Sequence, residues 1–288
     1  MTTNGKTAVV TGASAGIGEF VAQELARQSY KVVMLGRNPM NSDAALARIR
    51  ATVPGADVSM VVADLSVLAE ADRAANEVLQ QVDRIDLLIN NAGGTVPEHR
   101  VTPDGLEATF AGNHLGPFVL TNKLIAAIRT NDDARIVNVS SVGHRMIKDM
   151  VWDDLQLTQA YDPNKAYFQS KLANILWTRE LARRLAPLRI TANAMHPGMV
   201  DSNFAGRSNA MTRIAYAVTK PFLRSVAKGA ETVLWLATSP AAAGLTGGYY
   251  IDCKAAKTSR AADSDEGARR LWQISEELAA RKKATAQA

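Results

Sequence analysis

Short apolar runs alternate with amphipathic segments of helical periodicity along most of the sequence, and this alternation restricts the fold more than any other feature. The runs predict seven strands, at Thr7–Thr11, Lys31–Leu35, Val58–Ala63, Leu87–Asn90, Arg135–Ser140, Ile190–Met195 and Gly248–Ile251. The periodic segments predict helices near Ile17–Arg27, Ser42–Thr52, Val67–Val82, Gly105–Arg129, Pro163–Leu185, Gly229–Ala237 and Glu266–Lys282. Strands that alternate with helices form a mostly parallel sheet covered on both faces. We therefore predict an α/β fold.

The 288 residues contain no repeat, low-complexity run or linker that would divide them, so we expect a single domain over residues 1–288. A composition of 47% hydrophobic and 21% charged residues is typical of a soluble globular protein. No apolar run approaches the length of about 18 residues that a membrane span needs, and no signal pattern opens the chain. Cys253 is the only cysteine, which excludes an internal disulfide and fits the reducing cytoplasm. We expect no metal site.

The formal charge of +5 and the pI near 9.3 admit two interpretations. One is a nucleic-acid or acidic lipid partner. The other is a basic surface with a few cationic groups near an anionic cofactor. Lys and Arg are dispersed and no nucleic-acid motif is present, so the second interpretation is favoured and no nucleic-acid partner is expected. The sequence leaves open whether the chain forms a homodimer.

A glycine-rich turn joins the first predicted strand to the first predicted helix. Its spacing, G-x-x-x-G-x-G, departs from the G-x-G-x-x-G dinucleotide fingerprint. The physical role is the same, because glycines let the backbone approach a pyrophosphate whose charge lies at the helix N-terminus. A plain tight connection is the alternative. We predict cofactor binding by Gly12, Ser14, Gly16, Ile17 and Gly18.

The residue that follows the second strand indicates which dinucleotide binds. A carboxylate is expected there when the ribose has a free 2′-hydroxyl, whereas arginine accommodates a 2′-phosphate. Arg37 occupies this region, 21 residues after Gly16, so NADP(H) is favoured over NAD(H). An ordinary surface arginine is the alternative. Asp64 and Leu65, after the third strand, lie at the same sheet edge and are expected to border the adenine.

Two further turns follow strands at this carboxyl edge, where parallel sheets bind ligands. Asn91, Ala92 and Gly93 follow the fourth strand, although such a run also occurs in plain turns. After the sixth strand, the chain is predicted to turn around the nicotinamide at Pro197, Gly198, Val200 and Ser202.

The string Tyr-x-x-x-Lys occurs four times, and its context distinguishes the copies. Tyr167 and Lys171 share one face of a long helix that Asp162 caps and Pro163 begins. A lysine cation near a phenol is expected to lower the tyrosine pKa below about 10. The other copies have less support. Tyr161 precedes the cap, Tyr250 lies in a strand, and Tyr216 lies in an irregular segment; their lysines are Lys165, Lys254 and Lys220.

Two other segments carry polar groups toward this region. Ser140 and Ser141 end the fifth strand, and alternation places their side chains on opposite faces, so only one should point into a given site. Within the helix near 105–129, Pro117 cannot donate to the carbonyl of Asn113, which frees a buried carbonyl for an ordered water. The neighbouring His114 is interpreted as structural or exposed.

Taken in order, these motifs resemble the short-chain dehydrogenase/reductase family over roughly residues 5 to 252. Four segments look most like its retinol-dehydrogenase branch: Arg135-Ile-Val-Asn-Val-Ser-Ser, Asn113-His-Leu-Gly-Pro-Phe, Tyr249-Tyr-Ile-Asp-Cys and, in the tail, Ala268-Arg-Arg-Leu-Trp. Many members of that branch use NADP(H). The resemblance implies a seven-stranded Rossmann-type sheet and a catalytic tetrad of Asn113, Ser141, Tyr167 and Lys171. Two departures stand out. Ser141 and Tyr167 are 26 residues apart, about twice the commonest family spacing, and no N-terminal anchor of the kind found in many animal members is visible.

The predicted function is hydride transfer between nicotinamide and a carbonyl or alcohol carbon, with Tyr167 as general acid/base. Ser141 would orient the substrate oxygen, and Lys171 would hold the ribose and tune the tyrosine. The direction of the reaction stays open, and an NADP(H)-sensing regulatory protein is the alternative. A variable substrate loop at about residues 203–226 mixes apolar side chains with arginines. This mixture indicates a lipophilic substrate, or else a helix that packs on the domain. A helical extension is expected at about 263–284.

Overall fold

The computed structural model describes residues 4–128, 133–200 and 224–285, with the side chains of 281–285 excepted. Its centre is one sheet with the strand order β3-β2-β1-β4-β5-β6-β7-β8. The strands are β1 (Thr7–Thr11), β2 (Lys31–Gly36), β3 (Val58–Val62), β4 (Leu87–Asn90), β5 (Arg135–Val139), β6 (Thr191–His196), β7 (Tyr249–Ile251) and β8 (Lys254–Ala255). All neighbours pair in parallel except β7 and β8. The predicted Rossmann-type α/β fold is confirmed, and all seven predicted strands are found.

The eighth strand corrects the predicted strand number. Asp252 and Cys253 both have positive φ, at 52° and 59°, and connect β7 to the antiparallel β8 in a two-residue turn. Tight hairpins favour glycine, asparagine or aspartate at such left-handed positions. Asp252 is of this kind and Cys253 is not, and the prediction ended the strand at Ile251 without recognising the turn.

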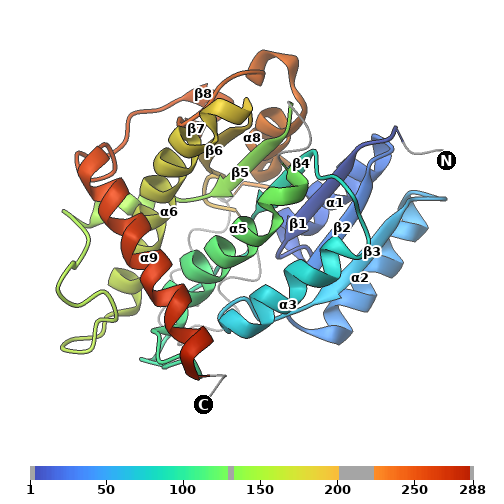
Figure 1. Ribbon diagram of the computed structural model, residues 1–288. Helices are drawn as coiled ribbons and strands as arrows, with labels where there is room; N and C mark the ends of the chain where they lie inside the picture. Colours follow the sequence, from blue (N-terminus) through green and yellow to red (C-terminus); the bar gives the residue numbers. More distant parts are fainter. Residues whose placement is uncertain (1–3, 129–132, 201–223, 286–288) are drawn as a thin grey trace.

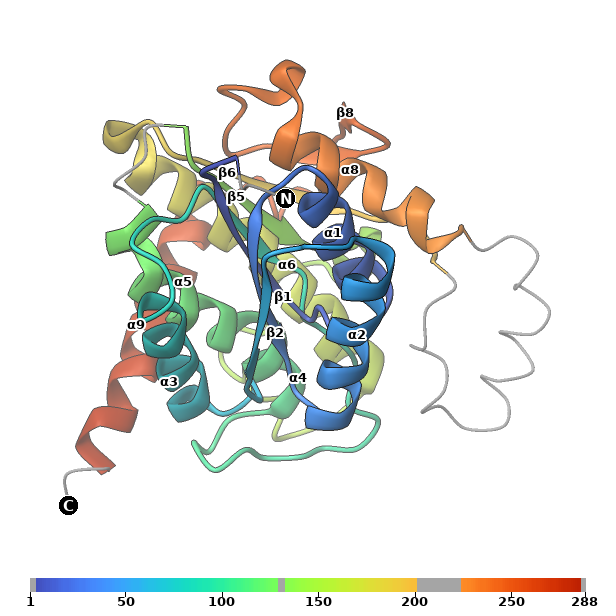
Figure 2. The same cartoon turned by 90° about the vertical axis from the view of Figure 1, so that its right-hand side faces the viewer.

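Helices cover both faces of the sheet, as Figures 1 and 2 show. The described helices are α1 (Gly16–Arg27), α2 (Pro39–Thr52), α3 (Leu68–Leu79), α4 (Ala108–Phe110), α5 (Gly116–Ile128), α6 (Pro163–Leu185), α8 (Val226–Thr238) and α9 (Asp265–Thr285). Residues of α1, α2 and α8 share one apolar core with Ala8 and Val10 of β1. Residues of α3, α5, α6 and α9 share the other core with Val9. The alternation along β1 thus supplies both cores.

Helix α9 packs against α6 and α5 and belongs to the core. The ring centroid of Trp272 lies 5.0 Å from that of Phe118, and the Arg184 guanidinium lies 4.2 Å from the Trp272 centroid. His114 is fully buried, and its Nε2 lies 2.8 Å from Oγ of Ser275. Burial lowers the pKa of His114 to about 3, so the imidazole is neutral. His114 is therefore structural, one of the two interpretations given above.

The helix around Asn113 is not a continuous α-helix. Residues Ala111–Leu115 form a π-helical turn between α4 and α5, and the Gly116 N–H donates to the carbonyl five residues back, at Ala111. Pro117 follows at once and has no N–H to donate. A π-turn widens the helix and often lies at a functional site. The proposed water on the Asn113 carbonyl stays a prediction.

Candidate active site

The glycine-rich turn lies against the loop that follows β4. A Cβ at Gly12 would lie 2.8 Å from Cα of Ala92, and one at Gly18 would lie 2.4 Å from Nδ2 of Asn91. Gly12 and Gly16 have positive φ, at 66° and 59°. Helix α1 begins here after Ala15, whose methyl side chain cannot accept from the first backbone amides. These amides and the close-lying backbone suit a pyrophosphate, so the residues fit the predicted dinucleotide.

Three predicted cofactor residues meet at the carboxyl ends of β2 and β3. Arg37 is about half exposed, and its Nη1 lies 3.8 Å from Oδ2 of Asp64. A Cβ at Gly36 would lie 3.1 Å from Cβ of Ser14, which places Ser14 beside the end of β2. This corner carries one exposed cation and a hydroxyl, which suits a 2′-phosphate, although Asp64 opposes part of the positive charge. Leu65 is buried, and its carbonyl contacts Gly116.

The side chain of Asn113 connects the loop after β4 to α6. Its Oδ1 accepts from the Gly94 N–H at 2.8 Å, and its Nδ2 donates to the Gly94 carbonyl at 2.8 Å and to Oγ of Ser170 at 2.9 Å. A Cβ at Gly93 would lie 3.1 Å from Nζ of Lys171 and 3.2 Å from Oδ1 of Asn113. A glycine at position 93 therefore lets the loop touch two residues of the predicted tetrad.

The two serines after β5 bond different residues of α6. Ser140 donates from Oγ to the Lys171 carbonyl at 2.7 Å and so holds α6 against the sheet. Oγ of Ser141 accepts from the Gly143 N–H at 3.1 Å, and a hydrogen bond links its side chain to that of Tyr167. Both hydroxyls therefore reach α6, Ser141 through the side chain of Tyr167 and Ser140 through the backbone of Lys171; that they point to opposite faces stays a prediction.

Tyr167 and Lys171 lie on one face of α6, but they do not interact as predicted. Lys171 is buried, donates from Nζ to the Val139 carbonyl at 3.0 Å, and has this nitrogen 5.5 Å from the Tyr167 ring centroid. Burial raises the pKa of Tyr167, and the hydrogen bond to Ser141 only partly opposes this. Burial also lowers the pKa of Lys171 to about 8. The prediction that Lys171 lowers the tyrosine pKa is therefore wrong for this arrangement.

The structure distinguishes the Tyr-x-x-x-Lys copies on geometry. Asp162 caps α6 by accepting from the Lys165 N–H at 2.7 Å, so Tyr161 precedes the helix. Tyr161 donates instead to the Val96 carbonyl. Tyr250 lies in β7 and Lys254 in β8, on different strands. The copy at Tyr216 and Lys220 lies outside the described residues.

The turn after β6 reaches the first turn of α1. Gly198 has φ of 84°, and a Cβ there would lie 2.5 Å from Cδ of Arg224, whose N–H donates to the Met199 carbonyl at 2.7 Å. A Cβ at Gly229 would lie 2.5 Å from Val200 Cγ2 and 3.2 Å from Ile17 Cδ1. Val200 and Ile17 were predicted to bind the cofactor from two different turns, and the structure brings them together across Gly229. Ser202 and most of the predicted substrate loop lie outside the described residues.

Several residues that shape the site were missed from the sequence. The Thr11 hydroxyl accepts from the Asn91 and Ala92 N–H groups, each at 3.0 Å, and so joins β1 to the loop after β4. Gln169 accepts from the Val151 N–H and donates to the Leu155 carbonyl, both at 2.9 Å. These two bonds fix the long connection between Ser141 and Tyr167. A buried-face position on α6 was the only signal for Gln169.

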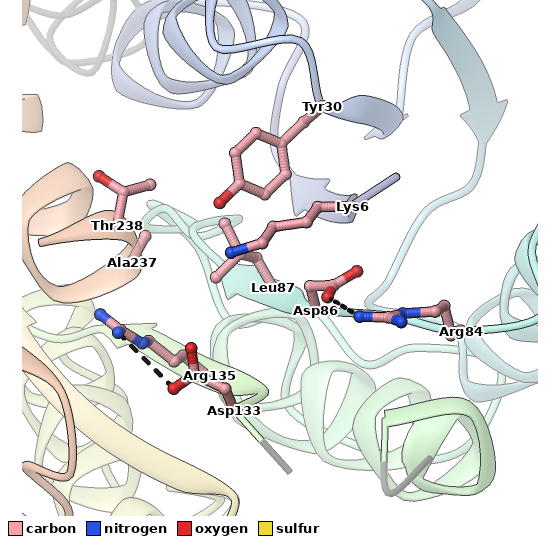
Figure 3. Close-up of a pocket in the computed structure, with 9 residues that line it drawn as sticks. All are labelled: Lys6, Tyr30, Arg84, Asp86, Leu87, Asp133, Arg135, Ala237 and Thr238. Atoms are coloured by element: carbon pink, nitrogen blue, oxygen red, sulfur yellow. Dashed lines mark hydrogen bonds and ion pairs between the residues drawn. The ribbon is translucent and has the colours of Figure 1, made fainter. Parts of the chain in front are cut away.

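A hollow lies at the opposite edge of the sheet, where β1, β4 and β5 begin (Figure 3). Asp86 accepts there from the Thr7 N–H at 2.8 Å and also from Arg84. Arg135 donates to the Ser239 carbonyl at 2.9 Å. These charged groups hold strands and helix ends together, far along the strands from the predicted tetrad.

The described residues lack two features of other classes of protein. No described helix is both long and apolar enough to span a membrane. Within the same residues, His, Cys, Asp and Glu side chains form no group of three or more that would hold a metal ion.

Comparison with known proteins gives consistent matches. The family described as short chain dehydrogenase matches residues 6–213. Retinol dehydrogenase 12 of Mus musculus is 38% identical over 274 residues, covering 95% of this chain and 86% of the relative. Retinol dehydrogenase 14 of Mus musculus is also 38% identical, over 287 residues, with 95% and 85% covered.

Solved structures agree with these sequence matches. An uncharacterized protein from Mycobacterium Paratuberculosis superposes with a TM-score of 0.76 at 32% identity, covering 96% of this chain and 93% of that one. The Pseudomonas aeruginosa RhlG/NADP complex gives a TM-score of 0.68 at 25% identity, with 86% and 94% covered.

Proposed function

The chain belongs to the short-chain dehydrogenase family, and from this premise we propose that it transfers hydride between NADP(H) and the carbonyl or alcohol group of a lipophilic small molecule. The observation that carries the proposal is the hydrogen bond between the Ser141 and Tyr167 side chains. Lys171 lies beside it, as does the loop after β4 whose Gly94 bonds Asn113. A donor, an orienting hydroxyl and a buried amine around one tyrosine are the groups that carbonyl reduction needs.

The choice of NADP(H) rests on Arg37. Its guanidinium stands at the end of β2 and is half exposed, so it remains accessible to a ligand. Charge-assisted bonds from arginine to a phosphate are stronger than those between neutral partners. The NADP complex of RhlG is a further support, because that protein shares the fold.

The proposed chemistry assigns a protonated phenol to Tyr167. A bound nicotinamide supplies or accepts the hydride. Because burial raises the pKa of Tyr167, the phenol keeps its proton near neutral pH and can donate it to a substrate oxygen. Oγ of Ser141 already accepts from the Gly143 N–H, so its own proton is available to the substrate oxygen or to Tyr167. Lys171, whose Nζ lies 5.5 Å from the Tyr167 ring centroid, would hold the ribose of the bound cofactor.

The proposed lipophilic substrate rests on apolar side chains that stay exposed next to these groups. Val142 and Met146 follow Ser141 in the short helix Val142–Met146, and Met199 follows Gly198. They are 36%, 71% and 63% exposed. Exposed large apolar side chains near a site favour an apolar ligand. The relatives named as retinol dehydrogenases act on such a molecule by name, which supports the same substrate class.

A steady-state assay tests the proposal. Purified protein is mixed with NADPH or NADH and a series of aldehydes of increasing chain length, including retinaldehyde, and the loss of NADPH absorbance is followed. We expect NADPH to be preferred and kcat/KM to rise with chain length. Binding of NADPH without turnover of any aldehyde, or of the matching alcohols with NADP⁺, would favour a cofactor-sensing protein instead.

A further inference from the structure

His144 is a buried histidine three residues after Ser141 that the proposed mechanism does not use. It lies in the short helix Val142–Met146, its side chain is fully buried, and its ring stands edge-on to Tyr249 with centroids 5.0 Å apart. Its ring nitrogens both have backbone partners. Nδ1 lies 2.6 Å from the Ser141 carbonyl oxygen, and Nε2 lies 3.3 Å from the Ser259 nitrogen.

These two partners select one form of the imidazole. A carbonyl oxygen can only accept, so Nδ1 must carry a proton; a backbone N–H can only donate, so Nε2 must be bare. The neutral Nδ1–H tautomer satisfies both bonds at once. Burial lowers the pKa of His144, in agreement with a neutral ring.

The bond from Nδ1 acts on the backbone of Ser141. The Ser141 carbonyl accepts from both the His144 ring and the His144 N–H, the latter at 3.2 Å. On the other side of the same residue, Oγ accepts from the Gly143 N–H. A Cβ at Gly143 would lie 2.7 Å from the Phe168 ring, so this turn has no room to shift toward α6. The carbonyl and hydroxyl of Ser141 are therefore held by one turn of chain.

The bond to Nε2 ties this turn to the segment that follows β8. Ser259 donates to the ring, and Arg145 donates to the Lys257 carbonyl two residues earlier. Oγ of Ser259 accepts from the Ala262 N–H at 3.3 Å. The segment that leads to α9 thus stabilises the imidazole tautomer in which Nδ1–H donates to the Ser141 carbonyl.

We propose that His144 is a positioning residue, which holds the Ser141 carbonyl so that the serine hydroxyl faces Tyr167, and that Ser259 fixes its tautomer. The inference deepens the proposed function and rests on it for its kinetic consequences. The geometry itself, an Nδ1–H tautomer bonded to Ser141, is independent of which substrate is turned over.

Three substitutions separate the two bonds. In His144→Asn the amide Nδ2 replaces Nδ1 and can still donate to Ser141, whereas the acceptor for Ser259 is lost. In His144→Gln the amide Oε1 replaces Nε2 and can accept from Ser259, whereas the donor to Ser141 is lost. His144→Phe keeps the ring and removes both bonds. Thermal melts of all three show which variants fold, and steady-state kinetics with NADPH and an aldehyde follow for those that do.

We expect kcat to fall about tenfold in the Gln and Phe variants and to stay within about threefold in Asn, since only Asn keeps the Ser141 bond. The KM for NADPH should change little in all three. An Asn variant as slow as Phe, or a Phe variant with unchanged kcat, would overturn the proposal.

Nitrogen-15 NMR of the imidazole in the unmodified protein keeps the inference testable when activity is absent. The Nδ1–H tautomer is the expected result, and an Nε2–H tautomer would overturn the positioning role whatever the kinetics. A chain with the Nδ1–H tautomer but no turnover of any carbonyl or alcohol would support the geometry and count against the proposed function alone.

Discussion

Asn113 holds Gly94 by two opposed hydrogen bonds, with Oδ1 accepting from its N–H and Nδ2 donating to its carbonyl, each at 2.8 Å. One amide side chain thereby fixes the backbone of the loop that touches Lys171 through Gly93. The π-helical turn around Asn113 directs this side chain away from a regular helical position. The loop, the helix and the lysine are consequently coupled through a single residue.

Replacement of Asn113 by Ala should lower both activity and stability. The Gly94 N–H and carbonyl lose the Asn113 side chain, and Ser170 loses one donor, which costs about 1–3 kcal/mol in the free energy of unfolding. We expect kcat with NADPH to fall more than tenfold, because the loop no longer holds its position beside Lys171. Chemical denaturation and steady-state kinetics measure the two effects. Asn76→Ala, at an exposed position of α3, is the control and should alter neither.

Arg37→Ala should reduce the preference for NADPH over NADH. Charge-assisted bonds to a 2′-phosphate contribute about 1.5–3 kcal/mol, or roughly 10- to 150-fold in affinity. Asp64→Asn should have the opposite effect and strengthen NADPH binding, because it removes the carboxylate 3.8 Å from the guanidinium. Titration of both cofactors measures the ratio. Arg48→Ala, which breaks a surface pair with Glu19, is a charge-matched control, and equal affinities in the unmodified protein would refute the assignment.

Tyr167→Phe should abolish turnover and leave NADPH affinity nearly unchanged, since only the phenolic group is removed. The same substitution at Tyr161, Tyr216 and Tyr250 should preserve catalysis. Initial rates and cofactor titrations of the four variants provide the measurement. An inactive variant among those three, beside an active Tyr167→Phe, would show that a different Tyr-x-x-x-Lys pair is catalytic.

The depressed pKa of Lys171 makes a prediction about stability and pH. Its pKa falls from 10.5 to about 8 on folding, so the unfolded chain binds more protons between these values, and this contribution to stability rises with pH across the window. Below pH 8 the buried cation costs about 3 kcal/mol. Lys171→Met removes the buried cation, so at pH 7 its free energy of unfolding should exceed that of the unmodified protein. We expect this difference to shrink from pH 7 to pH 10 by about the same amount. Denaturation without added cofactor measures it; a constant difference would exclude a depressed pKa.

Pro117→Ala should weaken catalysis more than folding. Alanine supplies the N–H that proline lacks, so it can bond the Asn113 carbonyl, favour α-helical geometry over the π-turn, and displace the predicted water. Alanine also favours helix, so the melting temperature should hold or rise. We expect a lower kcat and unchanged NADPH affinity. A normal kcat over the whole pH range would mean that the π-turn is only structural.

Local features of the fold followed from the sequence because short-range geometry is set by spacing along the chain. The seven parallel strands and the cap at Asp162 depend on periods of 2 and 3.6 residues and on one capping side chain. The glycine turn and the family membership came from ordered motifs. The strands, the cap and the glycine turn used residues within about one element of one another, whereas the family resemblance used the order of motifs over roughly residues 5 to 252.

Burial and distant contacts were decided only by the tertiary structure. The Tyr167 pKa rises rather than falls, because the folded chain removes the phenol from water and directs the Lys171 amine to a strand carbonyl. Ser259 meets His144 across 115 positions of sequence. No spacing rule joins groups so far apart, since their meeting depends on how the sheet and both helical layers pack, and desolvation depends on everything that packs around the group.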